Sequence, residues 1–261
     1  MRESPPQSPL EPVRLELADG LAVLRLARGK ANALDIELCR ALTARLGELG
    51  DSDARALILT GEGEMFSAGV DLPRLAAGGA PYVEEFLPAL SDAFMALFSF
   101  PRPVVAALNG HAIAGGAVLA AACDRRVMNV ERGRIGVTEL LVGVPFPIGA
   151  LEILRCAYGT ARLRELALLG RTFPAEEALA LGLVDEAAVG ERVVARATEV
   201  AVELAAIPAD SFTHVKRLLQ APYRQRIARD GAADDEAVTR LWTSPTTLAA
   251  LEHYSRRVLG R

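Results

Sequence analysis

The stretch Pro103-Val-Val-Ala-Ala-Leu-Asn-Gly-His-Ala-Ile-Ala-Gly-Gly-Ala-Val-Leu-Ala120 decides the class of fold. It carries no charge, and the uncharged run extends to Cys123, which is long enough for a membrane span. Asn109, His111 and several glycines interrupt it, however. We therefore expect a buried strand over 103–108 that leads through a glycine loop to a buried helix beginning at Gly115.

Short strands and helices alternate on both sides of this stretch. The pair Asp19-Gly20 separates two apolar segments with alternating patterns, which predicts a β-hairpin with a type I′ turn. Asp35 can cap a helix that Gly50 ends. The predicted elements are the hairpin 13–26, a helix over 36–49, a strand over 56–60, a helix over 81–99 and a strand near Val127. This order predicts an α/β core with buried strands.

Strand signals stop at about residue 189. The remaining sequence is rich in Ala, Leu and charged residues, which predicts helices broken at Pro208, Pro222 and Pro245. We expect three parts: a disordered tail over 1–12, a core with the active site over 13–195, and a helical C-terminal segment over 196–261. The segment is interpreted as an appendage of the core rather than as a second active domain.

The composition excludes several classes of protein. The 261 residues carry 29 basic and 33 acidic side chains without a basic stripe, so we expect no nucleic-acid partner. The chain has 3 widely spaced cysteines, which is typical of reduced thiols in a cytoplasmic protein. Its 3 histidines form no cluster, so no metal site is expected.

The loop Phe66-Ser-Ala-Gly-Val-Asp-Leu72 is the first candidate for a functional site. Gly69 allows a backbone conformation that can direct an N–H group into a cleft. In the alternative interpretation this is an ordinary loop in which Asp71 caps the next helix. Ser67 is not expected to be a nucleophile, because Met65 occupies the position of the first glycine of a Gly-x-Ser-x-Gly elbow.

Gly115 and Glu139 are the other candidates. A helix N-terminus has free N–H groups that bind oxyanions, so Gly115 can supply one such donor; equally, Gly115-Gly116 can serve only close packing. Glu139 is surrounded in sequence by apolar residues, and such a carboxyl tends to have a raised pKa that suits proton transfer. The alternative is a surface glutamate that begins a short helix.

Together these three segments resemble the enoyl-CoA hydratase/isomerase (crotonase) superfamily. Gly29-Lys-Ala-Asn-Ala-Leu34 and Ala175-Glu-Glu-Ala-Leu-Ala-Leu-Gly-Leu-Val-Asp185 extend the resemblance over nearly the whole chain. It implies a spiral of ββα units, a C-terminal segment that assembles homotrimers or hexamers, and an acyl-CoA thioester as substrate. It implies no cofactor other than the coenzyme A of the substrate and no membrane partner.

The resemblance also implies roles for individual residues. Ala68 and Gly115 would supply the two N–H groups of an oxyanion hole, with Glu139 as the acid–base group. Residues Ala68, Gly69, Val70 and Asp71 would line the entry for CoA. Lys30 and Lys216 occupy positions of CoA-contacting lysines, and both are equally compatible with solvated surface charges.

One position departs from the pattern of the two-carboxylate hydratases. Val118 stands where they carry a second glutamate, and Pro147 stands where dienoyl-CoA isomerases carry an aspartate. The resemblance therefore favours a Δ3,Δ2-enoyl-CoA isomerase with Glu139 as its single base. The alternatives are an enoyl-CoA hydratase of low or altered activity and an acyl-CoA-binding member without catalysis.

Overall fold

The computed structural model describes residues 11–259, and within this range the chain folds as an α/β structure with two sheets. The larger sheet has six strands in the order β1-β2-β3-β5-β7-β10, and the smaller has four in the order β4-β6-β8-β9. The strands are β1 (Val13–Ala18), β2 (Leu21–Leu26), β3 (Ala56–Gly61), β4 (Met65–Ser67), β5 (Val104–Leu108), β6 (His111–Ile113), β7 (Arg125–Asn129), β8 (Arg134–Gly136), β9 (Thr172–Pro174) and β10 (Glu186–Ala188).

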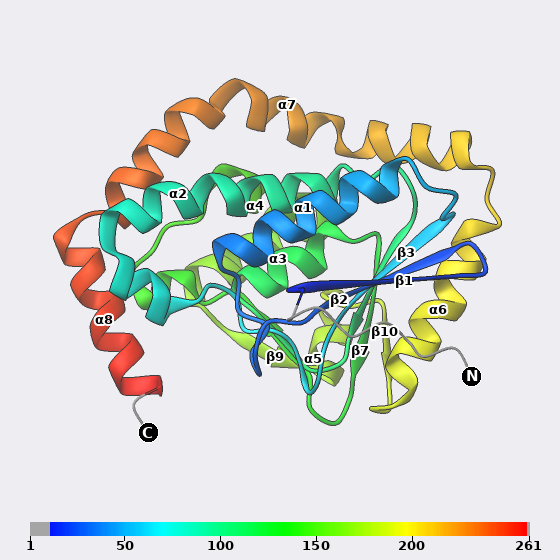
Figure 1. Cartoon of the computed structure of the whole chain (residues 1–261), viewed down its shortest axis with the longest axis horizontal. Coiled ribbons are helices and arrows are strands. Elements are labelled where there is room, and N and C mark those ends of the chain that lie inside the picture. Colours follow the sequence, from blue (N-terminus) through cyan, green and yellow to red (C-terminus); the bar gives the residue numbers. More distant parts are fainter. Residues whose placement is uncertain (1–10, 260–261) are drawn as a thin grey trace, which may run out of the picture.

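Helices cover both faces of the larger sheet (Figure 1). The helices are α1 (Ile36–Gly50), α2 (Leu72–Phe98), α3 (Gly115–Ala122), the 3-10 helix η1 (Glu139–Val142), α4 (Ile148–Leu169), α5 (Ala175–Ala180), α6 (Arg192–Ala205), α7 (Ala209–Trp242) and α8 (Pro245–Leu259). One face packs into the main core with α1, α2 and α3. The other face packs against α6 through a separate apolar cluster that includes Ile58, Val105 and Val200.

Three consecutive ββα units build the centre of the molecule. The pairs β3-β4, β5-β6 and β7-β8 each place one strand in the larger sheet and one in the smaller, and each pair is followed by a helix. This is the spiral expected from the resemblance. Strands β4, β6 and β8 are parallel, so the loops that follow them leave the smaller sheet at one edge.

The predicted hairpin is confirmed. Strands β1 and β2 pair antiparallel with Ala18 opposite Leu21, which leaves a two-residue turn. Both turn residues have positive φ, 53° at Asp19 and 75° at Gly20, as a type I′ turn requires. Glu11 and Pro12 of the predicted tail are tied to the fold, since Ala27 N–H donates to Pro12 O at 2.8 Å. The rest of that predicted tail lies outside the described residues.

Two helix predictions are wrong at their boundaries. The helix expected over 81–99 begins earlier, at Leu72, because Asp71 caps it by accepting a hydrogen bond from Arg74 N–H. A kink at Gly79, with φ 60° and ψ −153°, separates this first part from the predicted one. Pro222 does not break a helix: α7 runs from Ala209 to Trp242.

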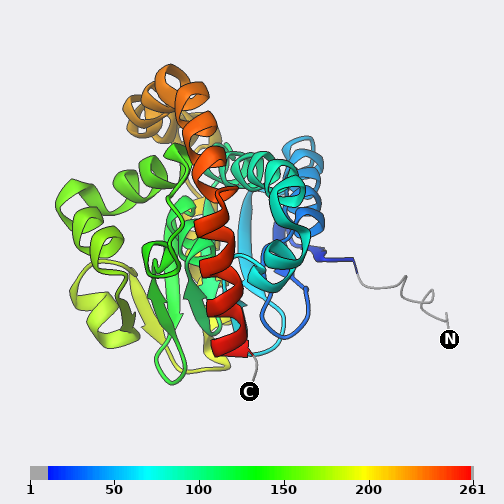
Figure 2. The same cartoon turned by 90° about the vertical axis from the view of Figure 1, so that its left-hand side faces the viewer.

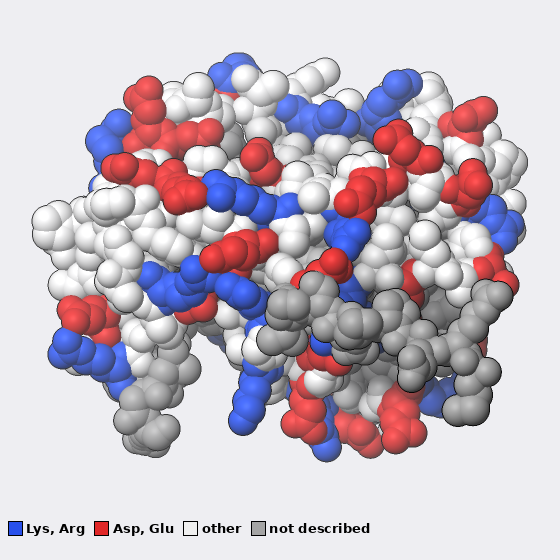
Figure 3. All heavy atoms as spheres, in the orientation of Figure 1, with Lys and Arg blue, Asp and Glu red and all other residues white. Residues whose placement is uncertain are grey.

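The two C-terminal helices pass over the core. Helix α7 arches along α2 and α4, and α8 then packs against α2 and η1 (Figures 1 and 2). Basic and acidic side chains are interspersed on the face shown in Figure 3. None of the helices in residues 11–259 is long and apolar enough to cross a membrane.

Candidate active site

The three sequence motifs meet at one edge of the smaller sheet. Ala68 follows β4, Ala114 follows β6 and Val137 follows β8, and these strands are parallel neighbours. Loops at the carboxyl ends of parallel strands converge, which is why ligand sites occur there. The topology thus brings together Gly69, Gly115 and Glu139 from three separate ββα units.

Gly69 allows two of these loops to touch. Its φ is 82°, and a Cβ atom built on it would lie 2.7 Å from Ala114 Cβ and 3.0 Å from Gly115 N. Only glycine fits this approach without displacing backbone. On the other loop, Ala114 has φ 52° and ψ −124°, a conformation that is costly for a residue with a side chain. Such strain is concentrated at sites where backbone groups must point in a set direction.

Val70 and Gly115 each carry a free N–H group on these loops. Leu34 N–H donates to Gly69 O, and Asp71 N–H donates to Leu34 O. Val70 lies between these two hydrogen bonds, and its own N–H group has no acceptor among the described residues. Gly115 is the first residue of α3, where a helix has no internal acceptor for the N–H group. Within residues 11–259, neither N–H group donates to a protein acceptor.

The structure corrects the assignment of Ala68. Its N–H group donates to Ala31 O at 2.9 Å and is therefore not available to a ligand. Ala68 still lines the cavity, as do Val70 and Asp71. The pair of donors that can hold an oxyanion is Val70 and Gly115, two residues further along the first loop than the sequence indicated.

Asn32 and Ser67 hold the Gly29–Leu34 loop against β4. The Asn32 side chain is fully buried and donates to Glu62 O at 3.0 Å and to Met65 O at 2.7 Å. Ser67 Oγ donates to Asn32 O at 2.8 Å and accepts from Gly69 N–H. Ser67 is thus a structural residue, and the rejection of a serine nucleophile agrees with its burial.

Glu139 begins η1 and is buried, with 8% of its surface exposed. Its Oε2 atom is buried and has no hydrogen-bond partner among the described residues. Burial away from water disfavours the charged form and raises the pKa of Glu139 to about 7. A carboxyl that is half ionised near neutral pH can both accept and return a proton.

A cavity of about 410 Å³ joins Glu139 to the two loops. Arg28 and the exposed Lys30 lie at its solvent side, and Thr138, Val142 and Val144 line it near the carboxyl group. Asp71 also lines it, but its carboxyl group caps α2. Glu139 is the one acidic lining residue with an unpartnered buried oxygen in the described range.

Two lining residues come from the C-terminal helices, and no sequence motif pointed to them. Trp242 ends α7 and Tyr254 lies on α8. The appendage predicted over 196–261 therefore forms part of the cavity wall. The end of α7 and helix α8, drawn in orange and red in Figure 2, thus contribute aromatic rings to a cavity whose other lining residues lie far earlier in the chain.

Val118 does not line the cavity. It is 1% exposed and belongs to the main core. A side chain at Gly115 would also point into the core, because its Cβ would lie 2.7 Å from Leu34 Cδ1 and 3.5 Å from Phe94 Cζ. Among the described residues, Glu139 is therefore the one lining residue whose carboxyl group has an unpartnered buried oxygen. Both interpretations of Gly115 hold, because its N–H group is free and the absence of a side chain permits close packing.

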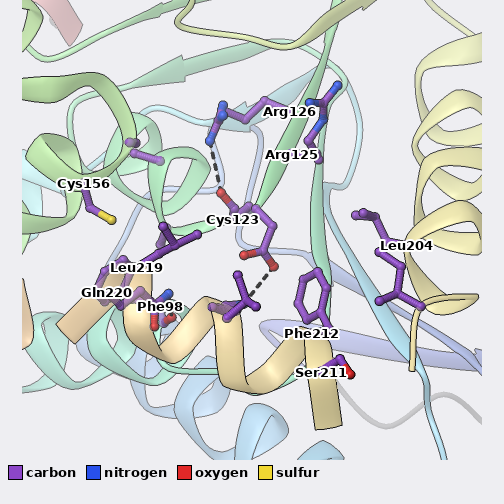
Figure 4. A pocket seen from close by; sticks show the side chains of 17 residues that line it. Phe98, Cys123, Arg125, Arg126, Cys156, Leu204, Ser211, Phe212, Leu219 and Gln220 are labelled. Carbon is purple, nitrogen blue, oxygen red and sulfur yellow. Dashed lines mark hydrogen bonds and ion pairs between the residues drawn. The ribbon is translucent and has the colours of Figure 1, made fainter. Parts of the chain in front are cut away.

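Lys216 lies apart from this site. It lines a second and larger cavity, of about 560 Å³, between the start of α7 and the ends of α3 and α6 (Figure 4). Its ammonium group is buried, 2.7 Å from Asp124 Oδ2 and 3.2 Å from Arg102 O. The structure does not bring Lys216 together with Glu139 and Lys30, and it is not a solvated surface charge.

Comparisons with known proteins agree with this geometry. A profile described as enoyl-CoA hydratase/isomerase matches residues 16–254. A probable enoyl-CoA hydratase, EchA17 of Mycobacterium tuberculosis, is 41% identical over 169 residues, which cover 64% of each chain and so just under two thirds of the relative. A putative enoyl-CoA hydratase of Thermus thermophilus is 38% identical over 196 residues, covering 74% of this chain and 77% of that one.

Among solved structures, human mitochondrial Δ3-Δ2-enoyl-CoA isomerase superposes with a TM-score of 0.91. The two are 26% identical, and the match covers 95% of this chain and 98% of the human one. This chain belongs to the enoyl-CoA hydratase/isomerase family. The relatives include proteins named as hydratases and a protein named as an isomerase, so family membership leaves the reaction to be decided from the site.

Proposed function

We propose that this protein is a Δ3,Δ2-enoyl-CoA isomerase with Glu139 as its only acid–base group. The observation that carries the proposal is the single buried carboxyl group with an unpartnered oxygen beside two free backbone N–H groups. Moving a double bond along an acyl chain needs one base and a means of holding an enolate. These are the groups that the cavity offers.

The reaction proceeds in two proton transfers. Ionised Glu139 removes a proton from C2 of a 3-enoyl thioester, and the electron pair left behind delocalises onto the thioester oxygen as a dienolate. The N–H groups of Val70 and Gly115 stabilise this negative charge, and a donor of this kind is typically worth about 3 kcal/mol. Protonated Glu139 then delivers the proton to C4, which gives the 2-enoyl thioester with no net change in atoms.

Hydration of a 2-enoyl thioester is the second candidate, favoured by the name of the 41% identical relative. Hydration needs a group that orients water as well as one that transfers the proton. Val118 cannot do this, and Asp71 already uses Oδ1 to cap α2. A non-catalytic binding protein is less favoured because a buried carboxyl group without a partner lowers stability and is retained only where it serves a purpose.

A substrate screen tests the assignment. The purified protein is incubated with 3-enoyl-CoA and, separately, with 2-enoyl-CoA, and the absorbance of the conjugated thioester is followed. An isomerase increases the absorbance with the first substrate and leaves the second almost unchanged. Rapid loss of absorbance with the second substrate supports the hydratase, and no change with either supports a binding protein.

The CoA portion of the substrate is proposed to lie at the solvent side of the cavity. Arg28 and Lys30 are cationic side chains there, and phosphate groups favour such neighbours. Arg28 is also paired with Asp35 at 2.6 Å, which leaves Lys30 as the more mobile contact. The predicted contact through Lys216 has no support from its position, because that ammonium group is buried against Asp124.

We also propose that the protein assembles as a trimer or hexamer. Helix α7 exposes Val215, Leu218 and Leu219, each with more than half of its surface in contact with solvent (54%, 57% and 66%). Grouped apolar side chains of this kind are typical of subunit interfaces. Light scattering at micromolar concentration checks the assembly, and a stable monomer would contradict it.

A further inference from the structure

Trp242 is the only tryptophan of the chain, and it lines the cavity that holds Glu139. Only 2% of its surface is exposed. Of the cationic lining residues, Lys30 is exposed and Arg28 is half-buried. The cavity therefore has charged side chains on its exposed side, and its buried lining includes Glu139 and the indole ring of Trp242.

The indole ring is fixed on two sides. Its Nε1–H group donates to Pro145 O at 2.9 Å, which ties the end of α7 to the loop that follows Glu139. Phe86, which is fully buried on α2, packs against the ring with centroids 6.4 Å apart. Because protein interiors are close-packed, a ring with this support cannot turn aside without displacing its neighbours.

This placement bears on the acyl chain of a substrate. The charged CoA portion suits the exposed side, and Glu139 fixes where the reacting carbons lie. The carbons beyond them must extend towards Trp242. A cavity of about 410 Å³ has to hold part of the CoA arm as well as the acyl group, so little space remains before the indole.

We propose that Trp242 closes the acyl end of the cavity and restricts the protein to short acyl chains. This inference rests on the proposed function for the class of ligand, an acyl-CoA, but not on the reaction. Trp242 acts as a wall that determines specificity. Its removal lengthens the chain that the site accepts, and it does not alter the acid–base chemistry of Glu139.

Binding of saturated acyl-CoA thioesters tests the proposal, since these compounds cannot react. Affinities are measured by calorimetry for the series butanoyl-, hexanoyl-, octanoyl-, decanoyl- and dodecanoyl-CoA. A buried methylene is worth about fourfold in affinity. For the wild type we expect this increase to stop, or to reverse, before decanoyl-CoA. For Trp242→Ala we expect it to continue through decanoyl-CoA.

Two further variants keep the test informative. Trp242→Leu is a smaller change and replaces Trp242→Ala if that variant does not fold. It should also shift the chain-length limit to longer acyl chains. Tyr223→Ala is the matched control. Tyr223 is also an aromatic residue of α7, but it does not line the cavity, so the chain-length limit of this variant should equal that of the wild type. In the wild type, the fluorescence of the single tryptophan should change when butanoyl-CoA binds.

The possible failures can be told apart. If the affinity of the wild type rises fourfold per methylene up to dodecanoyl-CoA, Trp242 does not close the cavity. The same conclusion follows if wild type and Trp242→Leu have the same chain-length limit. If the wild type shows a chain-length limit but converts no 3-enoyl-CoA, the role of Trp242 stands and the proposed isomerase activity is contradicted. Absence of binding by every thioester in the series overturns both.

Discussion

Two cavities of this protein, one beside α7 and one at Glu139, differ in how their polar groups are partnered. In the larger one, beside α7, the buried cations are in ion pairs: Lys216 with Asp124 at 2.7 Å, and Arg126 with Asp185 at 2.8 Å, although Arg126 Nε has no hydrogen-bond partner among the described residues. The smaller one is lined by Glu139, whose Oε2 is buried without a partner among the described residues, and by the Val70 and Ala114 loops, on which the N–H groups of Val70 and Gly115 have no protein acceptor. By volume, the cavity beside α7 (Figure 4) would be the candidate functional site. The unpartnered polar groups instead indicate the cavity at Glu139.

Polar groups that are available for function are those that the fold leaves without a protein partner. A protein interior normally satisfies its polar groups, because an unpaired one lowers stability. Groups left unpaired on the wall of a cavity are then free to act on a ligand. On this basis we infer that the cavity beside α7 serves the attachment of the C-terminal helices, and we propose catalysis only for the cavity at Glu139.

The largest expected effect is on catalysis at Glu139. Glu139→Gln keeps the shape of the side chain but cannot accept a proton, so isomerisation should fall by about 10²–10⁴-fold. Affinity for an unreactive acyl-CoA should stay close to that of the wild type. Activity within tenfold of the wild type would remove Glu139 from the mechanism and with it the contrast between the cavities.

Lys216→Met should instead affect stability. It leaves Asp124 without its partner in a mostly buried position, and breaking a buried ion pair costs about 3–5 kcal/mol, with the lower end expected here because Asp124 keeps 20% of its side chain exposed. Urea denaturation measures the loss, and turnover per folded molecule should not change. Adding Asp124→Asn should recover part of the stability. A selective loss of CoA binding in Lys216→Met would show that this cavity is functional after all.

Gly115→Ala should affect both properties by a smaller amount. The new Cβ would lie 2.7 Å from Leu34 Cδ1, and such overpacking costs about 1–3 kcal/mol. Turnover should fall as well, since relief of the clash moves the N–H group that faces the thioester. Gly149→Ala is the matched control, because its Cβ would meet nothing closer than Met95 Sδ at 3.9 Å. Normal turnover and stability in Gly115→Ala would place the oxyanion donor elsewhere.

The smallest expected effect is on the pH dependence of activity. With a pKa of about 7, the ionised fraction of Glu139 rises about tenfold between pH 6 and pH 8, and kcat/KM should rise with it. A flat profile over this range would contradict the role of Glu139 as the base.

Stability should change with pH in the opposite direction. The folded pKa of about 7 lies above the ordinary value of 4.5, so the folded state holds this proton more tightly than the unfolded state. The stabilisation is complete below about pH 4.5 and is lost as pH rises through about 7. Thermal unfolding of wild type and Glu139→Gln should therefore diverge in favour of the variant between about pH 4.5 and pH 7 and keep a constant offset at higher pH. Parallel curves would show that the carboxyl group is solvated.

Features set by neighbouring residues were predictable from the sequence alone. The type I′ turn at Asp19-Gly20, the cap at Asp35 and the start of α3 at Gly115 depend on contacts within a few residues. The choice of Glu139 also came from its local apolar surroundings, and its burial agrees with that choice. Pro222 misled the prediction because a proline within a long, well-packed helix can be tolerated at the cost of one hydrogen bond.

Tertiary structure decided which groups are free and what encloses them. Ala68 and Val70 look alike as sequence, and only the position of Ala31 O shows that the first N–H is occupied and the second is not. Likewise, nothing near Trp242 or Lys216 in the chain reveals that one faces Glu139 and the other Asp124. Local patterns specify the backbone because its conformation depends on adjacent residues. The partner of a buried polar group is set by which distant segments the fold places in contact, and that is known only once the helices and sheets have packed.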